Sequence, residues 1–149
     1  MPYAFEPLRK RIEVAANAPT RRLVVLKLDH LGDFIMALPA LERLRRYFLD
    51  SQIDLVVGSW NAGMARQIGI ADRVIPFDAF PRISTDVEPN VEARLGKFRD
   101  LVTDTYDIAV DLRTDTRTLL RAVRSPIKIG IGTQRQFPFL DIALPLDDT

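Results

Sequence analysis

Four ionisable side chains lie in one short turn, directly after an apolar run of the sequence. Residues 27–33 read KLDHLGD, and the ionisable ones are Lys27, Asp29, His30 and Asp33. A carboxylate in such a turn can act as a general base if it faces a cleft. The backbone N–H groups from Gly32 onward could bind an anion or a hydroxyl, and Gly32 would let a substrate approach the backbone closely. The turn is therefore the first candidate for chemistry.

Two roles are open for Asp33 on physical grounds alone. Aspartate is a favoured helix N-cap, so Asp33 could cap the helix that follows, or it could act as a base. Lys27 is harder to explain, because the interior of an apolar strand disfavours lysine unless its ammonium reaches water or a carboxylate. The sequence predicts Asp33 as that carboxylate.

Strand and helix patterns alternate along the chain. Short apolar runs predict strands at residues 22–28, 53–58, 73–77, 106–112 and 127–132. Helical periodicity predicts helices at residues 33–48, 61–70, 91–105 and 115–124. Residues 78–90 are predicted to be a loop, and the tail at residues 137–149 is apolar but broken by prolines. The alternation predicts an α/β, Rossmann-like fold with a mainly parallel sheet and helices on both faces.

Two prolines bear on these elements. Pro76 indicates an edge strand or the end of a strand. Pro39 lies inside the predicted helix at residues 33–48, where a proline costs about 3 kcal/mol or more. Either residues 33–38 form a separate turn with Pro39 near the start of the main helix, or the helix kinks at Pro39.

Residues 1–20 are predicted to be an N-terminal extension that forms a short amphipathic helix. Its apolar positions are Leu8, Ile12 and Ala15, with Arg9, Lys10 and Arg11 between them. This helix could pack on the edge of the domain or contact an anionic membrane surface. Residues 21–149 are predicted to be the one domain that a chain of 149 residues accommodates.

Composition and missing motifs exclude several classes of protein. A net charge of +1 argues against a nucleic-acid partner, and the absence of cysteine excludes disulfides and thiolate metal sites. A dinucleotide fingerprint needs three glycines after the first strand, whereas only Gly32 is present. No P-loop and no Gly-x-Ser-x-Gly elbow occur. No apolar run is long enough for a transmembrane helix, and no secretory segment is evident, so a cytoplasmic protein is expected.

Two turns remain as candidate sites. In parallel α/β sheets, ligands bind beyond the carboxyl ends of the strands, where the strand order reverses. The turns after the first and the fourth predicted strands are therefore favoured. The second of these reads DLRTDTR and contains Asp111, Arg113 and Arg117. Its arginines suit carboxylate or phosphate groups.

The stretch RRLVVLKLDHLGDFIMALPALERLRRYFLDSQIDLVVG resembles the N-terminal end of glycosyltransferase family 9, the ADP-heptose:lipopolysaccharide heptosyltransferases. The shared pattern is an apolar strand, a basic residue, a Gly-Asp pair and a proline six residues on. The segment YDIAVDLRTDTRTLL resembles a later strand of that family that ends in aspartate. The matching residues are Lys27, Gly32, Asp33, Pro39, Asp111 and Arg117. The similarity covers residues 21–132.

The resemblance implies the acceptor-binding, N-terminal half of a GT-B fold in an inverting glycosyltransferase. Such an enzyme transfers heptose from a nucleotide-heptose to a lipopolysaccharide-type acceptor at the cytoplasmic face of the inner membrane. The resemblance implies that Asp33 is the catalytic base and that no metal or cofactor is tightly bound. The implied acceptor contacts are Lys27, Gly32, Asp111, Arg113 and Arg117. It assigns no role to Asp29 or His30, which are expected to be local variation.

Two features depart from the family pattern. Thr114 stands where the family often has glycine. A family member is also much longer, so the C-terminal domain that binds the ADP-heptose-like donor is expected to be absent, and this chain alone should transfer nothing. Two other interpretations stay open: a non-catalytic Rossmann-like binding or interaction module, and a different nucleotide-binding α/β protein.

Overall fold

A computed structural model describes residues 21–80, 91–133 and 135–145. The strands are β1 (Arg22–Lys27), β2 (Gln52–Val57), β3 (Arg73–Pro76), β4 (Ile108–Asp111), β5 (Ile127–Ile131) and β6 (Ile142–Leu144). The α-helices are α2 (Leu31–Tyr47), α3 (Ala62–Ile68) and α4 (Val91–Leu101), and the 3₁₀ helices are η2 (Ser59–Asn61) and η3 (Arg117–Ala122). All five predicted strands are confirmed. The helix expected within residues 1–20, and residues 81–90 of the expected loop, lie outside the described residues.

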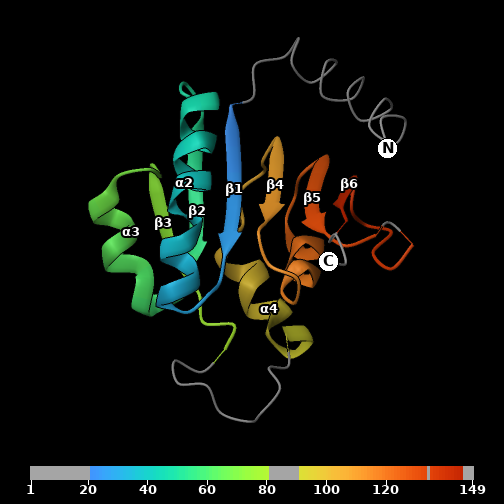
Figure 1. The fold of residues 1–149 in the computed structure, drawn as a ribbon. Helices are drawn as coiled ribbons and strands as arrows, with labels where there is room; N and C mark the ends of the chain where they lie inside the picture. The colour runs from blue at the N-terminus through green and yellow to red at the C-terminus, as the bar shows by residue number, and fades with distance from the viewer. Residues whose placement is uncertain (1–20, 81–90, 134, 146–149) are drawn as a thin grey trace.

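The six strands form one parallel sheet in the order β3-β2-β1-β4-β5-β6 (Figure 1). Val25 at the middle of β1 lies opposite Leu55 of β2 and Val110 of β4. From β1 the chain continues through β2 to the edge strand β3, and β4 then lies on the opposite side of β1. The order therefore reverses between β1 and β4, which is where a ligand crevice is expected. The edge position predicted from Pro76 is confirmed.

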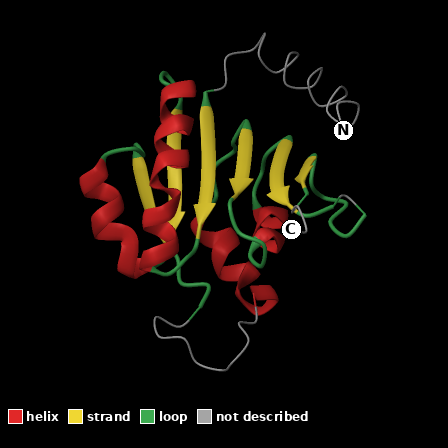
Figure 2. Cartoon of the chain, in the orientation of Figure 1, coloured by secondary structure: helices red, strands yellow, loops and turns green. Residues whose placement is uncertain are grey.

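Helices cover both faces of the sheet (Figure 2). Successive residues of β1 point to opposite faces, as in any strand, so Leu26 joins a cluster with Phe98 of α4 and Leu120 of η3. Val25 joins the other cluster, where it packs with Phe34 of α2. The predicted Rossmann-like architecture is confirmed. In the described ranges, no helix is long and apolar enough to cross a bilayer.

Helix α2 runs without interruption through Pro39, so the prediction of a separate turn at residues 33–38 is wrong. Proline removes the hydrogen bond that its N–H would donate to the carbonyl of residue 35. Ile35 is 45% exposed and Pro39 is also exposed, so water can satisfy that carbonyl. Solvent exposure on this side lets the helix retain the proline.

Two elements near the C-terminus differ from expectation. The strand β6 was missed because it has only three residues and lies in the proline-broken tail, yet it pairs with Ile129–Ile131 of β5. The helix predicted at residues 115–124 is instead the 3₁₀ helix η3. The Thr116 hydroxyl donates a hydrogen bond to the Asp111 carboxylate, and this contact keeps Thr116 close to the end of β4. The helix therefore begins only at Arg117. The 3₁₀ helix η3 spans six residues, whereas most 3₁₀ runs have no more than three or four.

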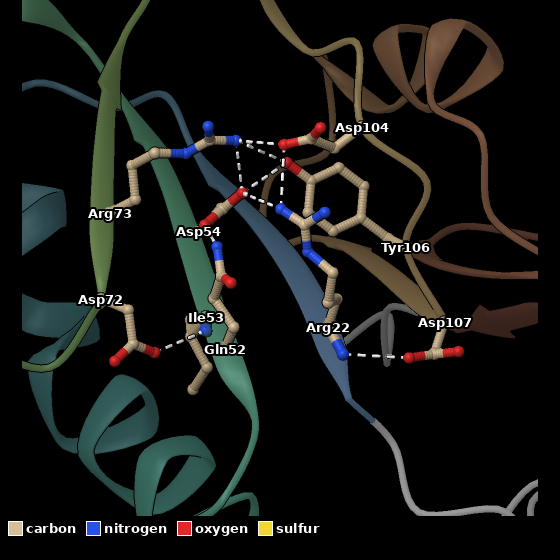
Figure 3. A network of polar contacts seen from close by, with 9 residues as sticks. All are labelled: Arg22, Gln52, Ile53, Asp54, Asp72, Arg73, Asp104, Tyr106 and Asp107. Carbon is tan, nitrogen blue, oxygen red and sulfur yellow. Dashed lines mark hydrogen bonds and ion pairs between the residues drawn. The ribbon is translucent and has the colours of Figure 1, made fainter.

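A polar network ties the strands together at their amino ends, away from the crevice (Figure 3). Asp54 of β2 is completely buried and accepts hydrogen bonds from Tyr106 at 2.5 Å and Arg73 at 2.6 Å. Arg73 and Arg22 each donate to Asp104 at 2.9 Å. Burial, followed by the Asp54 carboxylate, raises the pKa of Tyr106. Every charge in this network has an internal partner, which indicates a structural role.

Candidate active site

A cavity of about 440 Å³ opens between the turn after β1 and the turn after β4. It is lined by Lys27, Asp29, Asp33, Met36, Ala37, Leu112, Arg113 and Thr114. This is the point where the strand order reverses, so the cavity lies where the topology predicts a ligand. Among the residues predicted from sequence, the structure brings Lys27, Asp33 and Arg113 together around it.

Asp29 is the carboxylate that pairs with Lys27. Its Oδ2 atom lies 2.6 Å from the Lys27 ammonium, and its Oδ1 atom accepts a hydrogen bond of 3.0 Å from Arg113. Side chains two positions apart on an extended chain share a side, and the intervening Leu28 turns into the core. The prediction that Asp33 pairs with Lys27 is therefore wrong, and Asp29, which is only 4% exposed, is not local variation.

Asp33 is the third residue of α2, and His30 occupies the N-cap position. The capping role considered for Asp33 is therefore wrong, although a carboxylate in the first turn is favoured by the positive end of the helix dipole. The Asp33 side chain is exposed and lines the cavity. Within the described ranges its carboxylate makes no hydrogen bond or ion pair, which leaves both oxygens available to a ligand.

Aromatic and amide side chains hold the β1–α2 turn in place. The Asp29 carbonyl accepts hydrogen bonds from Trp60 at 3.0 Å and from Asn61 at 2.9 Å. The His30 ring stacks on Trp60 and on Phe80, with centroids 5.5 Å and 6.4 Å apart. His30 therefore packs against the aromatic side chains that hold this turn. These partners were not predicted from the sequence. The only tryptophan, Trp60, lies shortly after the second predicted strand and could have indicated an aromatic contact there.

Arg113 is almost fully engaged by the protein. Its Nη1 group donates to the Leu28 carbonyl and to Asp29, while Nε and Nη2 donate to the two Asp115 oxygens at 2.6 Å. The guanidinium also lies 4.4 Å from the Phe80 ring. Burial lowers the pKa of Arg113, but the hydrogen bond and charge of Asp115, together with Asp29, outweigh it, so the pKa is raised. Arg113 therefore stays charged, and contacts with the described residues leave one of the five N–H donors of an arginine unused.

Asp111 lies behind the cavity at the end of β4. It is 1% exposed, and its two oxygens accept hydrogen bonds from the Thr116 hydroxyl at 2.8 Å and the Arg113 backbone at 3.0 Å. Burial raises the pKa of Asp111 to about 7, against the opposing effect of these two hydrogen bonds. Its position supports the turn that carries Arg113.

Arg117 and Gly32 do not line the cavity. Arg117 donates to the Ile131 carbonyl at 2.8 Å and stacks 3.7 Å from the Phe137 ring centroid, so it connects η3 to β5. Burial lowers its pKa, against the charges of Asp111 and Asp115. A β-carbon added at Gly32 would meet no atom within 4 Å, so the backbone there is open on its outer side.

Solved structures of glycosyltransferases share this fold. A glycosyl transferase of family 9 from Veillonella parvula superposes with a TM-score of 0.70 and 24% identity over 87% of this chain. The E. coli heptosyltransferase WaaC, solved with ADP, superposes with a TM-score of 0.64 and 20% sequence identity over 85% of this chain. The E. coli ADP-heptose lps heptosyltransferase II superposes with a TM-score of 0.60 and 16% sequence identity over 81% of this chain. The chain has the fold of one part of these enzymes.

The chain spans much less than the length of the structures it matches. It covers 37% of the Veillonella protein, 42% of WaaC and 33% of heptosyltransferase II. No family model and no curated protein sequence matches it. The likeness therefore concerns the fold, and the chemistry has to be argued from the cavity.

Proposed function

We propose that this chain is the acceptor-binding part of an inverting glycosyltransferase, with Asp33 as the general base. The observation that supports this most strongly is the placement of Asp33. Its carboxylate has no partner among the described residues, and it lines a cavity at the reversal point of the sheet, beside Lys27 and Arg113. A base needs access to the proton that it removes, and the exposed position of Asp33 at the cavity supports that role.

The proposed reaction is a single displacement. The acceptor hydroxyl enters the cavity and gives its proton to Asp33 while its oxygen attacks the anomeric carbon of the donor sugar. The new carbon–oxygen bond forms as the bond to the nucleoside diphosphate breaks on the opposite face, which inverts the anomeric configuration. The proton then passes from Asp33 to solvent, because the side chain is exposed.

The other predicted residues take supporting roles in this proposal. Lys27 and Arg113 line the cavity and orient the acceptor through the N–H donors that remain to them. Gly32 leaves the outer side of the turn open to the acceptor. Asp111 holds the backbone of Arg113, and Arg117 ties η3 to the end of β5. In this proposal Asp111 acts on the acceptor site through the turn after β4, and Arg117 acts by fixing η3, which follows that turn.

The donor and acceptor classes follow from the neighbours and are part of the proposal. WaaC was solved with ADP-2-deoxy-2-fluoro heptose, and heptosyltransferase II is described as an ADP-heptose lps enzyme. We assign an ADP-heptose-like donor, bound by a part of the full protein outside this chain, and a lipopolysaccharide-type acceptor. A lipid-linked acceptor would place the reaction at the cytoplasmic face of the inner membrane through peripheral contact.

The full protein that carries this chain provides the test. It is incubated with ADP-heptose and a lipopolysaccharide core acceptor, and the anomeric configuration of the product is read by NMR. The proposal predicts transfer with inversion. Transfer with retention would contradict the single displacement, and tight nucleotide binding by these 149 residues alone would favour a different nucleotide-binding α/β protein.

A further inference from the structure

We infer that the cavity is built to admit an uncharged hydroxyl-bearing group and to reject phosphate and carboxylate groups, and that Asp29 and Asp115 impose this selectivity. The inference deepens the proposed function, because it names the chemical class of the acceptor portion that reaches Asp33. It stands on the charges and the hydrogen-bond donors around the cavity.

Among the described residues, the charges that line the cavity cancel. Lys27 and Arg113 are the two cations, and Asp29 and Asp33 are the two carboxylates. Asp29 contacts both cations directly, at 2.6 Å and 3.0 Å. An anion entering the cavity would therefore meet cations that are already neutralised, and it would also meet the negative charge of Asp33.

Few donors remain for an anion. The Lys27 ammonium donates one hydrogen bond, of 3.3 Å, to the Leu112 carbonyl, and it forms an ion pair with the Asp29 carboxylate at 2.6 Å. Arginine recognises carboxylate and phosphate through two parallel N–H groups, but Asp115 occupies the Nε–Nη2 pair of Arg113 with both of its oxygens. In the described part of the chain, Arg113 keeps a single donor and offers no two-pronged contact, and the charge of Lys27 is balanced by Asp29.

The groups that remain suit a hydroxyl. A hydroxyl donates one hydrogen bond and accepts others. The carboxylate of Asp33, which has no partner among the described residues, can accept from it, and the remaining donors of Lys27 and Arg113 can donate to it. A sugar diol satisfies all of these groups, whereas a phosphate would leave Asp33 facing a like charge.

Asp29 cannot easily release the two cations. Its side chain is 6% exposed, and its backbone carbonyl is held by Trp60 and Asn61. Removing one member of a buried ion pair leaves the other charge uncompensated. The neutralised state of the cavity is therefore part of the fold and does not depend on a bound ligand.

Titration of the full protein with inorganic phosphate tests the inference. The Lys27 ammonium and the Arg113 Nε–H are followed by ¹⁵N NMR. In the wild type we expect no saturable shift of these two signals. In Asp29→Asn and in Asp115→Asn we expect saturable shifts, with an affinity at least roughly tenfold above the wild type. Asp100→Asn is the matched control, because it removes one exposed charge from α4, away from the cavity, and should behave as the wild type.

Two outcomes would overturn the inference. One is saturable phosphate binding at Lys27 and Arg113 in the wild type that is as tight as in the variants. The other is a folded Asp115→Asn protein that gains no affinity for phosphate. Asp115 is 48% exposed, so this variant should fold even if Asp29→Asn does not. Because the titration measures no transfer, its failure is separate from a failure of Asp33 as the base.

Discussion

The Lys27 ammonium and the Asp29 carboxylate lie 2.6 Å apart where β1 ends and the chain turns toward α2. The two side chains are 11% and 6% exposed, so the pair is nearly withdrawn from water. The same carboxylate reaches Arg113 in the turn after β4. Asp29 therefore connects the two turns that form the cavity, and its ion pairs fix the position of one turn relative to the other.

Replacing Asp29 by alanine should destabilise the protein markedly. The substitution leaves Lys27 without its carboxylate in a buried position, and breaking one side of a buried ion pair costs about 3 kcal/mol. Urea denaturation measures the free energy of unfolding. Asp100→Ala, at an exposed position of α4, should change it by less than about 0.5 kcal/mol. A similarly small loss for Asp29→Ala would show that the pair contributes little.

Asp111 should make stability depend on pH. Its pKa is raised to about 7 in the folded protein by burial, so the folded state binds the proton more tightly than the unfolded state does. This stabilisation is complete at low pH, below the unfolded pKa, and is lost as the pH rises through about 7.

The free energy of unfolding, measured near pH 5 and near pH 8, checks this expectation. Between these values the wild type should lose about 2 to 3 kcal/mol relative to Asp111→Asn, which has no carboxyl proton at this position. Parallel pH profiles for the two proteins would rule out Asp111 as the titrating group.

Gly58→Ala should disturb the support of the β1–α2 turn. A β-carbon at residue 58 would lie 2.6 Å from the Trp60 ring, too close for any packed pair. The ring must move, and the expected loss of stability is about 1 to 3 kcal/mol, as for other overpacked sites. Trp60 is the only tryptophan, so its fluorescence reports the movement directly.

Gly63→Ala is the matched control for this change. Residue 63 lies in α3, and a β-carbon there would meet no atom within 4 Å. Alanine is the better helix former by about 1 kcal/mol, so this variant should be slightly more stable with unchanged fluorescence. Equal fluorescence of Gly58→Ala and the wild type would refute the close contact.

Tyr106→Phe should weaken the network at the amino ends of the strands (Figure 3). The hydroxyl donates a 2.5 Å hydrogen bond to Asp54, which is completely buried. A hydrogen bond to a charged group contributes about 1.5 to 3 kcal/mol, and thermal unfolding should show a loss in this range. Tyr47→Phe removes a hydroxyl from a side chain that is 78% exposed and should have almost no effect. Equal melting temperatures for the two variants would contradict the assignment.

The sequence predicted most of the fold, because strand and helix periods carry that information locally. Residues 23–26, Leu-Val-Val-Leu, are apolar throughout, which is typical of a strand covered on both faces. The strand β6 was missed because three residues between prolines carry no period, and only pairing with β5 defines it. Two outcomes stayed open at Pro39, because the sequence does not show which side of a helix faces water.

The candidate site was predicted in part. Lys27, Asp33 and Arg113 were selected, and all three line the cavity. The partner of Lys27 was assigned wrongly, because the choice between Asp29 and Asp33 depends on where the strand ends and the helix begins. Arg113 and Asp29 are 84 residues apart in the chain. A contact between such distant segments produces no local pattern in the sequence.

The central claim is that Asp33 is the general base. Transfer by the full protein is compared for the wild type, Asp33→Asn and the exposed control Asp100→Asn, with folding checked by circular dichroism. We predict that Asp33→Asn keeps its fold and loses at least about a hundredfold in kcat, the usual contribution of a general base, while Asp100→Asn transfers normally. A well-folded Asp33→Asn protein that transfers sugar at the wild-type rate would contradict the account.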